Sequence, residues 1–188
     1  SAGLQAAGNR LYVAAETGVD VFDVSDPRGL VDVGSYDTPG FARGVALSGD
    51  IAFVADWEGG LRVIDVSNRS EPVEIGSFER STYSGFRNVA VSGDYAFVSD
   101  EFGPVRILDV STPTNPVEAV ELAGVGADEI VVRGERAYAA GRSGFTVLDV
   151  SDPTQPAVLG TNEALGGRGV AMAPDRPHLA FVAQYYTG

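Results

Sequence analysis

The chain has 188 residues, of which 44% are apolar and 21% charged, and it combines a formal net charge of −13 with a complete lack of cysteine. This length suits one domain with a packed core. The lack of cysteine excludes disulfides, thiol catalysis and cysteine-ligated metal sites. The acidic balance argues against nucleic acid as a partner, because DNA and RNA would be repelled. No apolar run reaches the roughly 18 residues that a membrane-spanning helix needs, so we expect no membrane insertion by this chain.

A repeated unit dominates the sequence. The tetrapeptide Ile64-Asp65-Val66-Ser67 recurs in closely similar form, with its aspartate at positions 23, 65, 109 and 149, spaced by 42, 44 and 40 residues. A glycine followed by a polar residue recurs independently with nearly the same spacing, at positions 8, 49, 93 and 134. Two landmarks that share one period indicate structural repeats. We place these at about residues 1–40 (partial), 41–84, 85–126, 127–167 and 168–188 (partial).

Each complete repeat is predicted to hold four short strands separated by turns. Residues 1–40 supply a second, third and fourth strand but no clear first one. The next repeat contains all four, at Gly44–Ser48, Ile51–Ala55, Leu61–Val66 and Val73–Phe78. The two repeats after it follow the same pattern, and residues 168–188 supply a first strand, Gly169–Ala173, and a second, Leu179–Ala183. The expected total is about seventeen strands.

The polarity of the strands indicates where they lie. The second strand is apolar at successive positions, as in Ile51–Ala55, which fits a strand covered on both faces. The fourth strand alternates, as in Val73–Phe78, which fits an outer strand exposed on one side. After the third strand, Asp65 and Asp109 are expected to close a turn by accepting hydrogen bonds from nearby backbone amides.

Four-stranded units of this length, with no helical stretch between them, are typical of blades in a β-propeller. We therefore predict an all-β propeller built from four-stranded antiparallel blades, with about four and a half repeats visible. If the first strand of the last partial repeat, Gly169–Ala173, closed a four-bladed ring, its second strand, Leu179–Ala183, would have no sheet to join. The chain is thus expected to be a segment of a larger ring. The alternatives are a ring completed by another copy of the chain and a compact small ring.

The residues also resemble a known family. The segments Gly44-Val45-Ala46, Ala52-Phe53-Val54-Ala55 and Val63-Ile64-Asp65-Val66-Ser67 are similar to the LVIVD repeat, and the similarity covers essentially the whole chain. This resemblance implies a propeller and an extracytoplasmic setting, because many proteins with this repeat are secreted or lie at the surface of bacterial and archaeal cells. It implies no reaction, because the family has no shared catalytic residues.

Propellers bind through loops at the face where each innermost strand begins. The residues at these strand entrances are, in register, Arg43, Arg87, Asp128 and Arg168, and we expect them to ring the axial channel. Three guanidiniums on one rim suit a carboxylate or a phosphate, because their forked donors match planar anions. The alternative is that these arginines pair with acids across blades and lock the ring, the acids being Asp56, Asp100 and Asp128.

The same face is expected to gather aromatic side chains in polar loops, a composition that suits contact with a protein or a glycan. The binding candidates among them are Trp57, Tyr83, Phe102 and Tyr185. The aromatic side chains expected on this face also include Tyr36, Phe78 and Tyr186. Phe41 and Phe86, close to the rim arginines, are instead expected to fill gaps between blades.

Catalytic chemistry has little support in the sequence. His178 is the only histidine, so a histidine-based triad or a multi-histidine metal site is impossible within this chain. We expect no catalytic residue, no metal and no cofactor. The sequence favours a non-catalytic binding module that is extracellular, at the cell surface or periplasmic, with a protein partner or a small anionic or glycan ligand. The alternatives are a structural subunit of a surface layer or larger complex, and an enzyme that uses carboxylates and arginines at the channel mouth.

Overall fold

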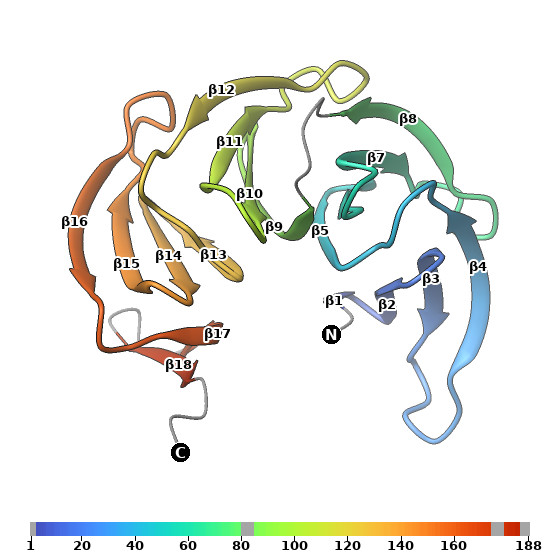
Figure 1. Cartoon of the computed structure of the whole chain (residues 1–188). Coiled ribbons are helices and arrows are strands. Elements are labelled where there is room, and N and C mark those ends of the chain that lie inside the picture. Colours follow the sequence, from blue (N-terminus) through green and yellow to red (C-terminus); the bar gives the residue numbers. More distant parts are fainter. Residues whose placement is uncertain (1–2, 80–84, 174–178, 185–188) are drawn as a thin grey trace.

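The computed structural model of the chain describes residues 3–79, 85–173 and 179–184 (Figure 1). Its strands form four sheets of four antiparallel strands and one sheet of two. Within each four-stranded sheet the strands follow chain order from the inside of the molecule to the outside (Figure 1). This arrangement confirms the prediction of an all-β propeller built from four-stranded antiparallel blades. Among the described residues, no helix has the length and apolar character needed to cross a bilayer.

The strands group into blades in chain order. Blade 1 consists of β1 (Gly3–Ala7), β2 (Arg10–Ala15), β3 (Gly18–Asp23) and β4 (Val31–Asp37). Blade 2 consists of β5 (Gly44–Ser48), β6 (Ile51–Ala55), β7 (Leu61–Asp65) and β8 (Val73–Phe78). Blade 3 consists of β9 (Phe86–Ser92), β10 (Tyr95–Asp100), β11 (Arg106–Asp109) and β12 (Val117–Glu121). Blade 4 consists of β13 (Glu129–Arg133), β14 (Arg136–Gly141), β15 (Gly144–Asp149) and β16 (Ala157–Asn162), and the last sheet pairs β17 (Gly167–Met172) with β18 (Ala180–Gln184).

The prediction that residues 1–40 lack a first strand is wrong. Strand β1 pairs with β2 along its whole length, from Gly3 opposite Ala14 to Ala7 opposite Arg10. Its sequence, Gly-Leu-Gln-Ala-Ala, contains no β-branched or aromatic residue, so local propensity does not indicate a strand. Pairing with β2 across a tight turn decides the conformation instead. The described residues therefore contain eighteen strands, rather than about seventeen.

The blades stand side by side in an arc around a common axis (Figure 1). Strands β1, β5, β9, β13 and β17 lie toward the axis, and β4, β8, β12 and β16 form the outer perimeter (Figure 1). The arc is open between the β17–β18 sheet and blade 1 (Figure 1). The described residues thus form a partial ring, as expected both for a segment of a larger propeller and for a ring completed by another copy of the chain, and not a compact small ring.

Apolar clusters between consecutive blades hold the arc together. One cluster joins blades 1 and 2, a second joins blades 2 and 3, and a third joins blades 3 and 4. Strand β6 contributes to two of them, because Ala52 and Val54 face blade 1 while Phe53 and Ala55 face blade 3. All four side chains are at most 2% exposed. This confirms that the second strand is covered on both faces, and burial of each large side chain contributes about 1.5–3 kcal/mol.

The recurrent Asp-Val-Ser sequence forms the turn that follows each third strand. The backbone N–H of Ser67 donates to Oδ1 of Asp65 at 2.8 Å, and that of Ser111 donates to Oδ1 of Asp109 at 2.9 Å. Hydrogen bonds from these serines hold the pKa values of Asp65 and Asp109 below the ordinary aspartate value. The expected role of these aspartates as local acceptors is confirmed.

Candidate functional site

The entrances of the inner strands converge on one depression near the propeller axis. It has a volume of about 180 Å³ and is lined by Gly3, Arg43, Arg87, Asn88, Asp128, Glu129 and Arg168. The structure thus brings together all four residues that the sequence assigned to the rim. They meet because they occupy the same register position at the start of β5, β9, β13 and β17, which lie next to one another around the axis.

Arg87 is neutralised by two carboxylates from its own and the following blade. Its Nη1 lies 3.1 Å from Oδ1 of Asp128 and 3.4 Å from Oε1 of Glu101, and its side chain is only 16% exposed. At this point of the rim, therefore, the cross-blade ion pair considered as the alternative is present. Asp56 does not follow that alternative, because its ion-pair partner is Arg62 on β7 of its own blade.

The residues that follow Arg43, Arg87 and Asp128 connect each inner strand to the inner strand of the next blade. Oδ1 of Asn88 accepts the backbone N–H of Ile130 at 3.1 Å, and Oε2 of Glu129 accepts that of Val170 at 3.1 Å. At the equivalent Gly44, a Cβ would lie 2.9 Å from the Cα of Asn88, so the backbones of β5 and β9 touch directly. Close backbone contact joins the first blades of the arc, and bonds from side chains to the backbone join the later ones.

Glu129 makes a pH-dependent contribution to stability. Burial raises the pKa of Glu129, while the hydrogen bond from Val170 opposes the shift. The folded state therefore binds this proton more tightly than the unfolded state, and stability falls as pH rises from the ordinary glutamate pKa through the folded value. Glu129→Gln keeps an acceptor for Val170 without a charge. We expect its free energy of unfolding, relative to the wild type, to increase from acidic to neutral pH in urea denaturation.

The matched control for this prediction is Glu135→Gln, because Glu135 is an exposed acid in a turn of the same blade. This variant should show no pH trend relative to the wild type. Equal trends in the two variants would assign the effect to the overall negative charge rather than to the burial of Glu129.

A second surface lies beside the rim, where Arg43 packs on Trp57. The guanidinium carbon lies 4.5 Å from the centroid of the indole ring, within the range of cation–π attraction. Phe102 meets the same indole edge-on, at a centroid distance of 6.5 Å, and remains 72% exposed. We call Arg43, Trp57 and Phe102 the aromatic surface. It combines residues of blades 2 and 3.

The backbone of Trp57 is held in an unusual conformation. Its φ of 48° is the only positive value at a described residue other than glycine, and such a φ is strained for a bulky side chain. The backbone N–H of Trp57 donates to the carbonyl of Phe86 at 3.0 Å, and the N–H of Phe86 donates back at 3.1 Å. A Cβ at Gly85 would lie 2.6 Å from the indole. The neighbouring blade therefore fixes the position of the indole.

The other aromatic candidates have different positions. Tyr83, Tyr185, Tyr186 and His178 lie outside the described residues. Phe78 packs against the core between blades 2 and 3 and stacks on Phe86 at 6.3 Å, so its role is in packing rather than at the surface. The hydroxyl of Tyr36 donates to Oε2 of Glu74 at 3.5 Å.

The expectation that Phe41 and Phe86 fill gaps between blades is confirmed for Phe86 and wrong for Phe41. Phe86 is 1% exposed and belongs to the core, whereas Phe41 is 53% exposed. The register explains the difference. Phe86 directly precedes Arg87, but the residue that directly precedes Arg43 is Ala42, which is 3% exposed. Phe41 is one position further away, and a shift of one residue turns a side chain to the other face.

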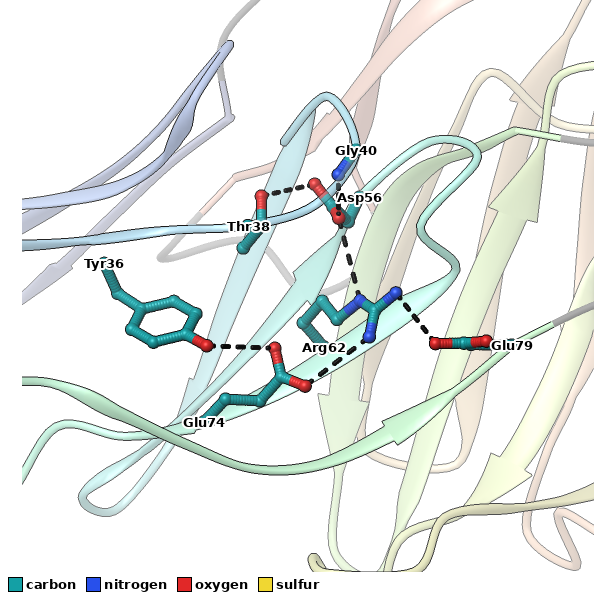
Figure 2. Close-up of polar contacts among 7 residues, drawn as sticks. All are labelled: Tyr36, Thr38, Gly40, Asp56, Arg62, Glu74 and Glu79. Carbon is teal, nitrogen blue, oxygen red and sulfur yellow. Dashed lines mark hydrogen bonds and ion pairs between the residues drawn. The ribbon is translucent and has the colours of Figure 1, made fainter.

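A buried polar network between blades 1 and 2 was not anticipated (Figure 2). Asp56 is fully buried; its Oδ1 accepts the hydroxyl of Thr38 at 2.5 Å, and its Oδ2 accepts the backbone N–H of Gly40 at 2.8 Å. Both donors lie in the connection from blade 1. Burial raises the pKa of Asp56, although these hydrogen bonds and the positive charge of Arg62 oppose the shift.

Arg62 extends the network outward. Its Nε lies 3.7 Å from Oδ2 of Asp56, its Nη1 3.5 Å from Oε1 of Glu74, and its Nη2 3.1 Å from Oε1 of Glu79 (Figure 2). The side chain of Arg62 is 8% exposed. One guanidinium therefore faces three carboxylates, an arrangement that compensates its removal from water.

Blade 3 repeats part of this arrangement. Arg106 forms ion pairs with Glu118 and Glu121, and its side chain is 5% exposed. This repetition is visible in the sequence, where equivalent charged residues of the two blades are separated by 44 positions: Asp56 and Asp100, Arg62 and Arg106, and Glu74 and Glu118. A charged residue that recurs in an otherwise apolar third strand indicates a buried ion pair.

Comparison with known proteins agrees with this architecture. The LVIVD repeat model matches residues 1–38, 39–80, 86–122 and 125–162. None of the curated proteins compared with the chain is similar in sequence.

Among solved structures, the fold is similar to three proteins of low sequence identity. The computationally designed Ika8 protein has a TM-score of 0.67 at 15% identity, over 92% of this chain and 52% of that one. A chain of the mitotic checkpoint complex has a TM-score of 0.72 at 16% identity, over 91% and 52%. A protein from Lactobacillus plantarum has a TM-score of 0.70 at 16% identity, over 92% and 56%. The chain spans about half the length of these structures, and identities this low show a shared fold alone.

Four consecutive matches therefore cover most of the chain, and their boundaries follow the four complete blades. The repeated Asp-Val-Ser turn and the four-stranded units agree with these matches. The chain belongs to the LVIVD repeat family.

Proposed function

We propose that the chain is a non-catalytic, extracytoplasmic binding segment whose partner is a protein that docks on the aromatic surface. One observation carries the proposal: Phe102 remains 72% exposed while it rests on Trp57, an indole that also stacks against Arg43. Tryptophan and arginine are the residues that most often dominate the energy of protein interfaces. The extracytoplasmic setting is supported by the family resemblance.

The rigidity of the aromatic surface supports the same proposal. Backbone hydrogen bonds to Phe86 and the close contact with Gly85 hold Trp57 in one position before any partner arrives. A surface that is already ordered loses little conformational entropy on association. A small anionic ligand at the rim has less support, because Asp128 and Glu101 already neutralise Arg87.

Site-specific photo-crosslinking tests the proposal. We expect a photoreactive amino acid at position 102 to crosslink one defined protein in extracts of the source cells. The purified form of that protein should bind the wild-type chain and bind Trp57→Ala at least about 30-fold more weakly, as expected for loss of a central tryptophan.

The control places the photoreactive residue at position 158 in β16, because Val158 is 56% exposed on the outer perimeter. Crosslinking of the same protein from both positions would contradict the proposal. So would unchanged affinity of the purified partner for Trp57→Ala, provided that circular dichroism shows the variant to be folded.

A further inference from the structure

The outer half of blade 4 carries an open apolar groove. It has a volume of about 410 Å³, and its apolar side chains are Phe145 and Val147 from β15 and Leu159 from β16. The last sheet packs on the inner half of the same blade, because β17 contacts β13 and β14. Leu159 is 51% exposed, and the two side chains from β15 are half-buried. Among the described residues, the last sheet thus leaves the face of β15 and β16 open.

The equivalent face is closed in the two preceding blades. Val63 in β7 and Ile107 in β11 occupy the position of Val147, two residues before the recurrent aspartate, and both are 0% exposed. Ile107 belongs to one apolar cluster with Leu148 and Val150 of the following blade. The side chains that close this face therefore come from the third strand of the next blade and its end, as two apolar residues that are two positions apart.

The last sheet has a free edge where such a strand would pair. In blade 4, β15 pairs with β14 on the side away from β13. The corresponding side of β18, which borders the opening of the arc (Figure 1), pairs with no described strand. Ala180 and Val182 of β18 are accordingly half-buried, whereas the equivalent Ala137 and Ala139 of β14 are at most 1% exposed. An unpaired strand edge is a template for pairing with a further strand.

A single extended segment fits this place better than a second folded copy of the chain. A whole blade stacked on the last sheet would cover β17 and β18 but leave the groove over β15 and β16 unfilled. A strand that pairs with β18 continues the sheet and lies over the groove, as each third strand lies over the preceding blade. Its main-chain hydrogen bonds supply affinity, and its alternate side chains supply specificity.

We propose that the outer edge of β18 takes up an extended segment of another protein chain, which pairs antiparallel with β18 and inserts a leucine and a valine, two positions apart, into the groove of blade 4. Leu148 and Val150 make the equivalent contact with blade 3. The inference goes beyond the proposed function, because Trp57 and Phe102 belong to blades 2 and 3 and do not line this groove. Loss of the aromatic surface would therefore leave strand binding intact, and the reverse.

The probe for this site is a capped peptide with the sequence of residues 144–150, Gly-Phe-Thr-Val-Leu-Asp-Val, and the target is the whole chain. Amide hydrogen exchange followed by NMR reports on the edge. We expect the peptide to protect alternate residues of β18, because only every second backbone N–H of a strand points to its outer edge. A peptide with serine in place of its leucine and last valine should bind at least tenfold more weakly.

Leu159→Asp and Val158→Asp form a matched pair of variants. Each adds one negative charge to β16, at side chains that are 51% and 56% exposed. Of the two, only Leu159 lines the groove, so Leu159→Asp should weaken binding of the peptide at least tenfold and Val158→Asp should leave it unchanged.

Three results would overturn the proposal. The first is equal affinity of the peptide for the wild type and for Leu159→Asp, and the second is a lack of alternate protection in β18. The third is a dimer of the chain in analytical ultracentrifugation that Leu159→Asp dissociates and the peptide does not, because a second copy would then occupy the groove.

Discussion

Asp56→Ala is expected to lower the free energy of unfolding by about 3–5 kcal/mol, because the variant leaves two donors between blades without their acceptor and removes one of the three carboxylates that face a buried arginine. Asp56 is fully buried and accepts hydrogen bonds from Thr38 and from Gly40. The substitution removes both acceptors and leaves Arg62, which is 8% exposed, with only the two more outlying glutamates. Thr38 and Gly40 belong to the connection from blade 1, so the lost bonds join two blades. Urea denaturation followed by circular dichroism measures the change.

Two further variants separate burial from charge in this prediction. Asp50→Ala removes an aspartate whose side chain is 60% exposed and pairs with Arg69 at 3.1 Å, and we expect it to cost less than about 1 kcal/mol, as for surface ion pairs. The double variant Asp56→Ala/Arg62→Met should be more stable than Asp56→Ala alone, because it no longer buries a guanidinium that has lost one of its three carboxylates. Equal losses in Asp56→Ala and Asp50→Ala would show that the network contributes nothing beyond an ordinary surface pair.

The fold was predictable because the repeat carries redundant information. The same turn, the same glycine and the same apolar second strand recur four times, so an ambiguous segment in one repeat is resolved by its equivalents. Strand β1 shows where this stops. Its residues have little strand propensity, and only pairing with β2 makes them extended. An alignment of the first repeat on the second would have placed it, because Gly3 corresponds to Gly44.

The candidate site was predictable only in part. Register alone places Arg43, Arg87, Asp128 and Arg168 at one rim, because equivalent positions of adjacent blades must lie side by side. Register does not determine which charges pair, since this depends on the reach and rotamers of long side chains. The pairing of Arg87 with Glu101, and the stacking of Arg43 on Trp57, therefore required the structure.

Phe86→Ala is expected to lower the free energy of unfolding by about 3–5 kcal/mol, as for other large-to-small changes in a packed core. Phe86 is 1% exposed, belongs to the cluster between blades 2 and 3, and stacks on Phe78. The backbone of the same residue is joined to that of Trp57, because residues 57 and 86 exchange two backbone hydrogen bonds. Trp57 is the only tryptophan of the chain, so its fluorescence reports on this interface during denaturation.

Phe41→Ala is the matched control, since the same side chain is removed from a position that is 53% exposed. We expect it to change stability by no more than about 0.5 kcal/mol, as is usual for surface substitutions. In folded Phe86→Ala the backbone hydrogen bonds to Trp57 and the contact of Gly85 with the indole are kept, so the emission of Trp57 should change only on unfolding, as in Phe41→Ala. Similar losses of stability in the two variants would contradict the assignment of Phe86 to the core and of Phe41 to the surface.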